Sequence, residues 1–490
     1  MADTTSKARA IASGWLSLST AKCVFMLSGY AIYFALPRLL STAEFGNYGV
    51  TIGFLSVFNM MLVVGAIQSV SKFVSEDPRK DSAVRKASCV VQGVFGGGTS
   101  VALFLTAPWA ARAFNDPSLT PLIRTGSIIP ILYAFYAAVI GSLNGRRLYR
   151  RQASLDITFA LIKTALVISG AYLAGSVIGA VAGFSVTAVA IMLIGGLTLW
   201  GTASEPEASP GSTQFPLKKY FRFQASIMIL TLLGNVLINL DLFLVKSILQ
   251  AGMDSDAAGL YTAVQAFSRI PYLLAVALAL VLFPLMSSSS FTNNMDQCRR
   301  YIRTAFRFPL VVFTPLSLFI ACFAADCLDF VYPPEFRSAA PALAILVLAE
   351  IVLALFYIAI TMINSSGSPM LSVLVTGVAI VVHALASVQC IDRYGLTGAA
   401  YGSLAGWTTG FCLSGLVLMH RFRAFIPPLT AARVAVASAG AVYAARVLPG
   451  TGMLRMGLGL VLIPLLFWGF LWLMREFTLS ELSEMMKKVF

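Results

Sequence analysis

The sequence predicts an all-α integral membrane protein with about 14 transmembrane helices, in which two six-helix lobes related by a parallel repeat are followed by two C-terminal helices. Three observations lead to this prediction: an apolar composition, a concentration of basic residues in alternate connections, and short motifs that recur at a nearly constant offset. Together they define the spans, their orientation and the relation between the two halves of the chain.

The composition is that of a chain whose surface faces lipid. Of its 490 residues, 58% are hydrophobic and 11% are charged, and the mean hydropathy is +0.83. Soluble domains carry about 25% charged residues, so most of this surface cannot face water. The apolar segments exceed the roughly 20 residues that span a hydrocarbon core. We expect helices, because an open sheet cannot satisfy its backbone hydrogen bonds in lipid.

Fourteen apolar segments are candidates for these helices. They lie near residues 11–36, 47–71, 87–111, 122–144, 154–174, 176–200, 221–249, 258–286, 304–325, 339–363, 369–391, 396–419, 428–447 and 455–474. The first follows Lys7 and Arg9 and is longer than the apolar region of a signal peptide, which has about 7–15 residues. We therefore expect an uncleaved first span.

Basic residues concentrate on one side of the expected membrane. When the connections are numbered alternately, one set contains 24 Lys and Arg residues and the other contains 8. Basic residues accumulate on the cytoplasmic side, so we expect a multi-pass protein of the inner (plasma) membrane with both termini in the cytoplasm. The same asymmetry explains the net charge of +14. No basic run is interleaved with aromatic residues, so no nucleic-acid partner is expected.

A polar segment over residues 202–216, TASEPEASPGSTQFP, separates the first six apolar segments from the next six. Its Ser, Pro and Glu content is typical of a linker rather than of a span. We therefore expect an N-terminal six-helix lobe over residues 1–205, a cytoplasmic linker over 206–216, a C-terminal six-helix lobe over 217–424, and two additional transmembrane helices with a cytoplasmic tail over 425–490.

Short motifs recur in the two lobes in the same order. The matched pairs are Pro121 with Pro341, Asn144 with Asn364, Gly179 with Gly398, Gly183 with Gly402, and Gly46-Asn-Tyr48 with Gly259-Leu-Tyr261. Their offsets are 220, 219 and 213 residues. Six spans per lobe is an even number, so the lobes share one orientation, as in parallel transporter repeats. Such lobes are expected to leave a central cleft, where substrate sites usually lie.

The sequence contains no motif of the common metal, nucleotide or nucleophile chemistries. None of the seven cysteines forms a C-x-x-C pair, and most lie in apolar segments, where we expect them to be small buried hydrophobes. H-E-x-x-H, a Walker loop and G-x-S-x-G do not occur. We therefore expect no catalytic residue, no metal site and no resident cofactor, with H+ or Na+ as the candidate coupling ions.

Three motifs resemble a known family. Residues 36–48, LPRLLSTAEFGNY, follow the first segment like the signature R-x-L-s-x-x-e-F-G-x-Y. Residues 241–245, DLFLV, end the seventh segment, and Gly259-Leu-Tyr261, Pro271 and residues 282–287, LFPLMS, frame the eighth. On these residues the sequence resembles the polysaccharide transporter (Wzx-like) branch of the multidrug/oligosaccharidyl-lipid/polysaccharide (MOP) flippase superfamily, over about residues 10–425.

The resemblance implies a two-lobe fold with a central cavity and alternating access. It also implies that an undecaprenyl-diphosphate-linked oligosaccharide is carried from the cytoplasmic to the outer leaflet for biosynthesis of a surface polysaccharide (O-antigen, capsule or exopolysaccharide). The implied partners are this lipid-linked oligosaccharide, the bilayer, and polysaccharide polymerase or export machinery. The drug-exporting branch usually has twelve spans, so the thirteenth and fourteenth argue against it.

Three basic residues lie well inside apolar segments: Lys22, Lys163 and Arg269. A charge at mid-membrane costs roughly 2.5–3.5 kcal/mol on insertion scales, so each needs a reason. We interpret them as cavity cations for the diphosphate, which a planar guanidinium can bind bidentately. Three alternatives stay open: an ion pair of Lys22 with a neighbouring helix, a structural pair of Lys163 with Asp156 two turns earlier, and a helix-capping contact of Arg269 near Pro271.

Two acidic residues are their counterparts, Asp241 and Glu350, which we interpret as candidates for ion coupling. The alternatives are a salt bridge or packing role for Asp241 and a pair with Arg269 for Glu350. His383 is expected in a helix contact. The basic cluster over residues 146–151 is interpreted as a topology signal that also attracts anionic headgroups, with recruitment of the diphosphate as the sharper alternative.

Four other functions fit parts of the sequence. A cation-coupled small-molecule exporter would favour acidic residues in the first lobe, where Lys22 and Lys163 stand instead. A flippase of the lipid-linked peptidoglycan precursor would also have fourteen spans. A membrane glycan polymerase or ligase would need a sizeable outer loop, whereas the longest, near residues 324–338, has only about 15 residues. A non-transporting scaffold would leave the mid-membrane charges unexplained.

Overall fold

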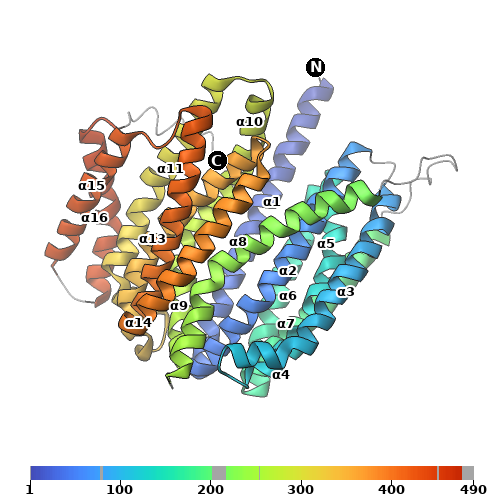
Figure 1. Ribbon diagram of the computed structural model, residues 1–490, viewed down its shortest axis with the longest axis horizontal. Helices are drawn as coiled ribbons and strands as arrows, with labels where there is room; N and C mark the ends of the chain where they lie inside the picture. The colour runs from blue at the N-terminus through green and yellow to red at the C-terminus, as the bar shows by residue number, and fades with distance from the viewer. Residues whose placement is uncertain (1, 78–80, 201–216, 253, 450–451, 477–490) are drawn as a thin grey trace. The chain divides into compact units, whose positions relative to one another are not determined.

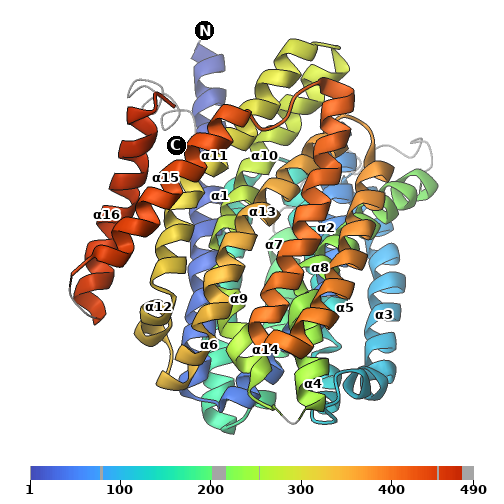
Figure 2. The same cartoon turned by 60° about the vertical axis from the view of Figure 1, so that its left-hand side comes forward.

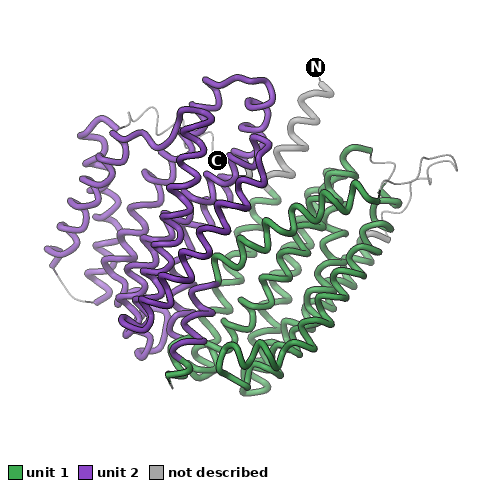
Figure 3. Tube along the Cα trace, in the orientation of Figure 1, with its two compact units in different colours: residues 1–239, 250–259 green, residues 240–249, 260–490 purple. Residues whose placement is uncertain are grey.

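The computed structural model describes residues 2–77, 81–200, 217–252, 254–449 and 452–476. Within these ranges the regular structure consists of helices, with no strand (Figures 1 and 2). The described residues divide into two compact units (Figure 3). Unit 1 comprises residues up to 239 together with 250–259, and unit 2 comprises 240–249 together with the chain from 260 onward. The predicted linker over 206–216 lies outside the described residues.

Unit 1 is a bundle built from the first seven helices and part of the eighth. Its helices are α1 (Ala2–Ala35), η1 (Leu36–Arg38), α2 (Thr42–Glu76), α3 (Asp81–Ala113), α4 (Leu119–Gly126), α5 (Ile129–Gly145), α6 (Tyr149–Ala174), α7 (Val177–Trp200), most of α8 (Leu217–Ala251) and the first turn of α9 (Ala257–Ser268). Helix α5 packs against α2, α3 and α7, and α6 packs against α1 and α7. The core of the unit therefore lies around α5.

The segment over residues 36–48 folds as a helix start. The Ser41 hydroxyl accepts a hydrogen bond from the backbone N–H of Glu44 at 3.3 Å, and the Glu44 carboxylate accepts one from the N–H of Ser41 at 3.2 Å. This reciprocal capping box fixes the beginning of α2. A Cβ on Gly46, one turn later, would lie 2.4 Å from the backbone nitrogen of Gly259. This segment therefore has a structural role: one part caps a helix and another permits close helix contact.

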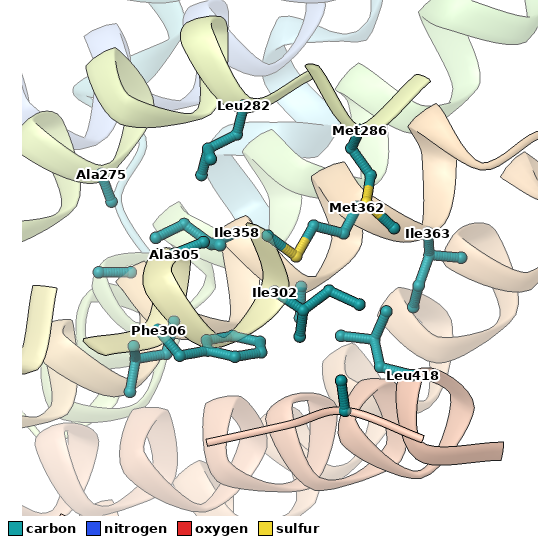
Figure 4. Close-up of a cluster of buried hydrophobic side chains, with 14 of the residues drawn as sticks. Ala275, Leu282, Met286, Ile302, Ala305, Phe306, Ile358, Met362, Ile363 and Leu418 are labelled. Atoms are coloured by element: carbon teal, nitrogen blue, oxygen red, sulfur yellow. The ribbon is translucent and has the colours of Figure 1, made fainter. Parts of the chain in front are cut away.

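Unit 2 is a second bundle, arranged around α13. Its helices are residues 240–249 of α8, the remainder of α9, α10 (Ile270–Phe291), α11 (Met295–Cys322), α12 (Ala324–Val331), η3 (Pro334–Ala339), α13 (Ala340–Ser365), α14 (Pro369–Phe422), α15 (Pro428–Val447) and α16 (Gly452–Leu473). Helix α13 packs against α10, α11 and α14. Leu282, Phe306, Met362 and Leu418 meet between these four helices in the apolar core that Figure 4 shows.

The number of spans agrees with the prediction of about fourteen. Within the described residues, twelve helices are long and apolar enough to cross a membrane. One of them, α14, has 54 residues and contains Gly395 at φ 55°, ψ −131°, so it is two helical arms joined at a sharp turn. The 20-residue α15 is not among the twelve. Counting the two arms separately and adding α15 gives the fourteen predicted segments.

The paired glycines of the repeat have the same role in both units. In unit 1, a Cβ on Gly183 would lie 2.1 Å from the carbonyl oxygen of Leu166, where α7 crosses α6. In unit 2, a Cβ on Gly402 would lie 2.0 Å from the Ser387 hydroxyl, where the second arm of α14 crosses the first. Glycine is needed at each crossing because the two backbones approach too closely for a side chain.

Two predicted spans are broken in the structure. The segment predicted over 258–286 is divided into α9 and α10 at Arg269, and the segment predicted over 122–144 is divided into α4 and α5 after Gly126. A proline follows each break, Pro271 and Pro130 respectively. Proline lacks an N–H and disfavours the helical conformation of the residue before it, so the helix is interrupted there.

The outer faces of both units are apolar. Leu197 of α7 is 67% exposed and Leu416 of α14 is 66% exposed, and many other large hydrophobic side chains are equally uncovered. A soluble protein rarely exposes so much contiguous apolar surface. These faces therefore contact lipid, and the chain is a multi-pass membrane protein.

Candidate functional site

The first group of predicted site residues lies in unit 1, on α1 and α6. The Lys22 ammonium is 3.4 Å from the Oδ2 atom of Asp156, which makes it both an ion pair and a hydrogen bond. Asp156 is buried, while 66% of the Lys22 side chain is exposed. The ion-pair alternative for Lys22 is thus present in the structure, and its partner is the aspartate that the sequence suggested for Lys163.

Lys163 has an aromatic rather than an acidic environment. Its ammonium lies 4.6 Å from the ring centroid of Phe25, 5.7 Å from that of Phe159 and 5.9 Å from that of Phe184. The structure places no carboxylate within 4 Å of this ammonium among the residues it describes. Cation–π attraction accounts for only about 0.5–2 kcal/mol, so the charge lacks a full counter-ion.

Phe25 joins the two lysines into one cluster, which we call the basic cluster: Lys22, Phe25, Asp156, Phe159, Lys163 and Phe184. The Lys22 ammonium is 6.0 Å from the Phe25 centroid, on the same ring that Lys163 faces. The Phe25 and Phe159 centroids are 5.5 Å apart. Two ammonium groups and one carboxylate leave the cluster with one excess positive charge. The aromatic members had no recognisable signal in the sequence, because Phe is common throughout apolar spans.

Asp241, in unit 2, has polar neighbours at both carboxylate oxygens. Its Oδ1 accepts hydrogen bonds from the Gln265 amide at 2.7 Å and from the backbone N–H of Leu242 at 2.9 Å. Its Oδ2 accepts a hydrogen bond from the Tyr261 hydroxyl at 2.9 Å and lies 3.2 Å from the Ser403 hydroxyl, whose single hydrogen the Ala399 carbonyl oxygen at 3.1 Å can also accept. The donors come from α8, α9 and the second arm of α14, so Asp241 ties three helices together.

His383 extends this network into the contact between the arms of α14. Its Nε2 is 3.1 Å from the Ser403 oxygen, and its ring meets that of Trp407 edge-on with centroids 6.0 Å apart. His383 is completely buried. The structure therefore places it in a helix contact, as the sequence indicated, and adds a hydrogen bond to the group that holds Asp241.

Glu350 lies on α13 and is 2% exposed. Its Oε2 is buried and accepts no hydrogen bond, and no cation lies within 4 Å of its carboxylate among the described residues. Arg269, at the break between α9 and α10, interacts electrostatically with both Glu350 and Asp241. The three predicted residues of unit 2 thus form one centre, which we call the acidic centre: Asp241, Tyr261, Gln265, Arg269, Glu350 and Ser403.

Sequence reasoning missed part of this centre. Tyr261 and Gln265 are one turn apart and continue to Arg269, so their common face was visible. Ser403 is 162 residues from Asp241, and nothing local marks it as a partner. The hydrogen bonds that Tyr261 and Gln265 of α9 donate to Asp241 could not be predicted from the position of Asp241 in the seventh apolar segment.

The arginine-rich segment over residues 146–151 is separate from the basic cluster, and one of its arginines has a structural role. The Arg146 guanidinium is 3.6 Å from Asp81 at the start of α3. Asp81 also accepts a hydrogen bond from Ser142 at 2.6 Å and lies 3.5 Å from Arg85. Arg147, Arg150 and Arg151 are exposed. One of the four arginines therefore holds α3 and α5 together, and the other three form a basic surface.

The chain belongs to the polysaccharide biosynthesis protein family, whose model matches residues 35–341, more than half of its length. This agrees with the family that the motif over residues 36–48 indicated. A partial match is also found to an uncharacterised membrane protein of Methanocaldococcus jannaschii, 26% identical over 153 residues. That match spans 30% of this chain and 30% of the relative.

Several solved transporter and flippase structures have the same fold. The lipid II flippase MurJ, in an inward closed conformation, superposes with a TM-score of 0.72 at 12% identity and covers 92% of this chain and 97% of its own. An inward-facing multidrug resistance transporter of the MATE family gives 0.67 at 13% identity, covering 84% and 98%. A MOP superfamily transporter from Pyrococcus furiosus gives 0.65 at 14% identity, covering 84% and 95%. Sequence identities this low establish a common fold only, and this chain therefore has the MOP fold.

Proposed function

We propose that the protein is a flippase that moves an undecaprenyl-diphosphate-linked oligosaccharide from the cytoplasmic to the outer leaflet by alternating access. The product would serve biosynthesis of a surface polysaccharide and pass to polysaccharide polymerase or export machinery. The proposal places the chain in the inner membrane with both termini in the cytoplasm. Membership of the polysaccharide biosynthesis protein family and the MOP fold support it.

The observation that carries the proposal is the excess positive charge of the basic cluster. Lys163 lies in the middle of α6 and is surrounded by three aromatic rings, with no carboxylate within 4 Å in the described part of the chain. A cation at membrane depth is costly without an anion. The diphosphate of a polyprenyl-linked saccharide is an anion that must cross the bilayer, and it would supply the missing counter-charge. Lys22 would add a second ammonium to the same ligand.

Arg269 is the third basic residue assigned to the diphosphate in this proposal. Its surroundings differ from those of the two lysines, because Asp241 and Glu350 already interact with its charge. An arriving diphosphate would have to compete with these carboxylates. We therefore expect substitution of Lys163 to affect transport more strongly than substitution of Arg269.

The test is complementation of a strain that lacks this gene. Lys163→Met keeps the length and apolar body of the side chain and removes the charge, and Lys86→Met, at an exposed position near the start of α3, is the matched control. We expect the deletion strain and Lys163→Met to accumulate lipid-linked oligosaccharide on the cytoplasmic leaflet and to lose at least about 90% of the surface polysaccharide. Lys86→Met is expected to restore both.

Other outcomes would overturn the proposal in different ways. An intermediate that reaches the outer leaflet but stays unpolymerised would favour a membrane polymerase or ligase. Accumulation of the lipid-linked peptidoglycan precursor alone would favour a flippase of that lipid, and drug sensitivity with normal polysaccharide would favour a small-molecule exporter. Normal export in Lys163→Met would remove the basic cluster from the mechanism.

A further inference from the structure

We propose that unit 2 binds an ordered water molecule at the turn between α13 and α14, where the water bridges the Asn364 amide and the Ser372 hydroxyl. The corresponding turn of unit 1, between α5 and α6, has a direct hydrogen bond between side chains at this place. The proposed water site is independent of what the protein transports.

The two turns have the same backbone conformation at an offset of 220 residues. The middle residue of each is left-handed, with φ 60° at Arg147 and φ 87° at Gly367. Three backbone N–H groups of each turn donate to carbonyl groups near the end of the preceding helix: in unit 1 from Arg146 to Ser142, from Arg147 to Asn144 and from Leu148 to Leu143, and in unit 2 from Ser366 to Met362, from Gly367 to Asn364 and from Ser368 to Ile363. Positions 364 and 372 are therefore related to each other as positions 144 and 152 are.

The side chains of the turn in unit 1 are paired with one another. The Asn144 amide nitrogen donates a hydrogen bond to the Gln152 Oε1 atom at 3.1 Å, and the Ser71 hydroxyl donates one to the Asn144 Oδ1 atom at 2.9 Å. Gln152 belongs to the first turn of α6 and is 6% exposed. Its long side chain thus reaches back to the end of α5 and closes the turn directly.

The turn in unit 2 keeps the asparagine but has a serine in place of the glutamine. Ser372 is completely buried in the first turn of α14. Its hydroxyl and the Asn364 Oδ1 atom are both buried, and neither has a hydrogen-bond partner among the described residues. Because the backbones match, the shorter serine side chain cannot span the distance that Gln152 spans in unit 1.

Water is the ligand that fits these two groups. Buried polar atoms are almost always paired with protein or with ordered water. Exchange of glutamine for serine on the same backbone leaves space of the size of the missing amide group, which a water molecule can fill. A buried water needs at least about two polar partners, and the asparagine amide and the serine hydroxyl supply them. Both side chains are neutral, so a neutral ligand is favoured over an ion.

The first test is a structure of the full-length protein at a resolution that shows ordered water. We expect density within hydrogen-bond distance of both the Asn364 amide and the Ser372 hydroxyl. In Ser372→Gln the new amide should displace this density and bond to Asn364 directly, as Gln152 bonds to Asn144. The reciprocal change, Gln152→Ser, should create the same density beside Asn144. A wild-type structure without this density, a direct bond between Asn364 and Ser372, or density that persists in Ser372→Gln would overturn the proposal.

The second test is thermal unfolding of the purified protein in detergent. Ser372→Ala removes one of the two partners of the water, so its Tm should fall below that of the wild type. If the two groups were dry, the same change would only remove an unsatisfied buried hydroxyl, and the Tm would stay constant or rise. The matched control is Ser414→Ala, also buried in α14, whose hydroxyl donates to the Phe411 carbonyl oxygen of its own helix at 2.9 Å. A Tm of Ser372→Ala at or above that of this control would contradict the water site.

Discussion

The clamp at Glu476 gives a prediction whose size follows from the structure. Glu476 follows α16, and only 3% of its side chain is exposed. Its carboxylate accepts hydrogen bonds from Arg307 of α11 at 3.0 Å, Arg433 of α15 at 2.8 Å and Thr430 of α15 at 2.6 Å. Figures 1 and 2 show α15 and α16 next to α11. The Arg307 bond joins Glu476 to α11, and the Arg433 and Thr430 bonds join it to α15.

Glu476→Gln should loosen this clamp at nearly constant volume. The glutamine can accept hydrogen bonds through one oxygen only, and its amide group faces the other guanidinium. Removal of one partner from a buried ion pair costs about 3–5 kcal/mol. Arg307 and Arg433 keep 26% and 24% of their side chains exposed, so the lower end, about 3 kcal/mol, is expected.

The assay is denaturant unfolding of the detergent-solubilised protein, combined with hydrogen exchange in α15 and α16. Exchange should accelerate in these two helices before it does in α13. The matched control is Glu76→Gln at the exposed end of α2, for which the expected change is below about 0.5 kcal/mol. If Glu476→Gln unfolded like this control, the clamp would not hold the C-terminal helices, and the reasoning from its three bonds would be refuted.

Two further predictions concern unit 1. Gly183→Leu should abolish recovery of folded protein on size-exclusion chromatography, because its Cβ would lie 2.1 Å from the Leu166 carbonyl oxygen. Gly98→Leu is the control and should behave like the wild type, because a Cβ at Gly98 has nothing within 4 Å. Equal recovery of both variants would contradict the close crossing of α6 and α7. Asp81→Asn should lower the free energy of unfolding by about 1–3 kcal/mol, because it weakens the interactions of Asp81 with Ser142, Arg85 and Arg146. The control is Asp296→Asn, which removes an exposed ion pair and should lower the free energy of unfolding by less than about 1 kcal/mol. A larger effect of Asp296→Asn than of Asp81→Asn would refute the role of Asp81.

The spans could be predicted because lipid imposes a strong and local constraint on sequence. The predicted apolar segments are helical, two of them with a break, and the sharp turn in α14 falls at Gly395, between two predicted segments. The repeat was equally visible, because the glycines at positions 183 and 402 are needed where two backbones nearly touch. The segment over 258–286 was predicted as one span because apolar composition continues across both helices, but the capping alternative for Arg269 near Pro271 agrees with the position of Arg269 at the start of α10.

The residues of the candidate site could be selected from the sequence, but the contacts between them could not be predicted. Charges in apolar spans identified Lys22, Lys163, Arg269, Asp241 and Glu350, because each needs a reason at that depth. Which of them meet depends on how helices distant in sequence pack. Their partnership could not be read from the chain.

Asp156 and Ser403 illustrate this limit. Asp156 was noted as a neighbour of Lys163 on the same helix face, but it pairs with Lys22, which is 134 residues away. Ser403 reaches Asp241 across 162 residues. The distinction between Asp241, which has polar neighbours at both carboxylate oxygens, and Glu350, whose Oε2 accepts no hydrogen bond from the described residues, exists only in the folded chain.

The measurement that tests the central claim most directly is lipid translocation by the purified protein in liposomes. A polyprenyl-diphosphate-linked oligosaccharide would be incorporated in the inner leaflet, and its arrival in the outer leaflet followed by lectin binding. The account predicts transfer by the wild type and by Lys86→Met, and a loss of at least about tenfold in rate for Lys163→Met. Transfer by Lys163→Met at the wild-type rate, or no transfer by the wild type, would contradict it.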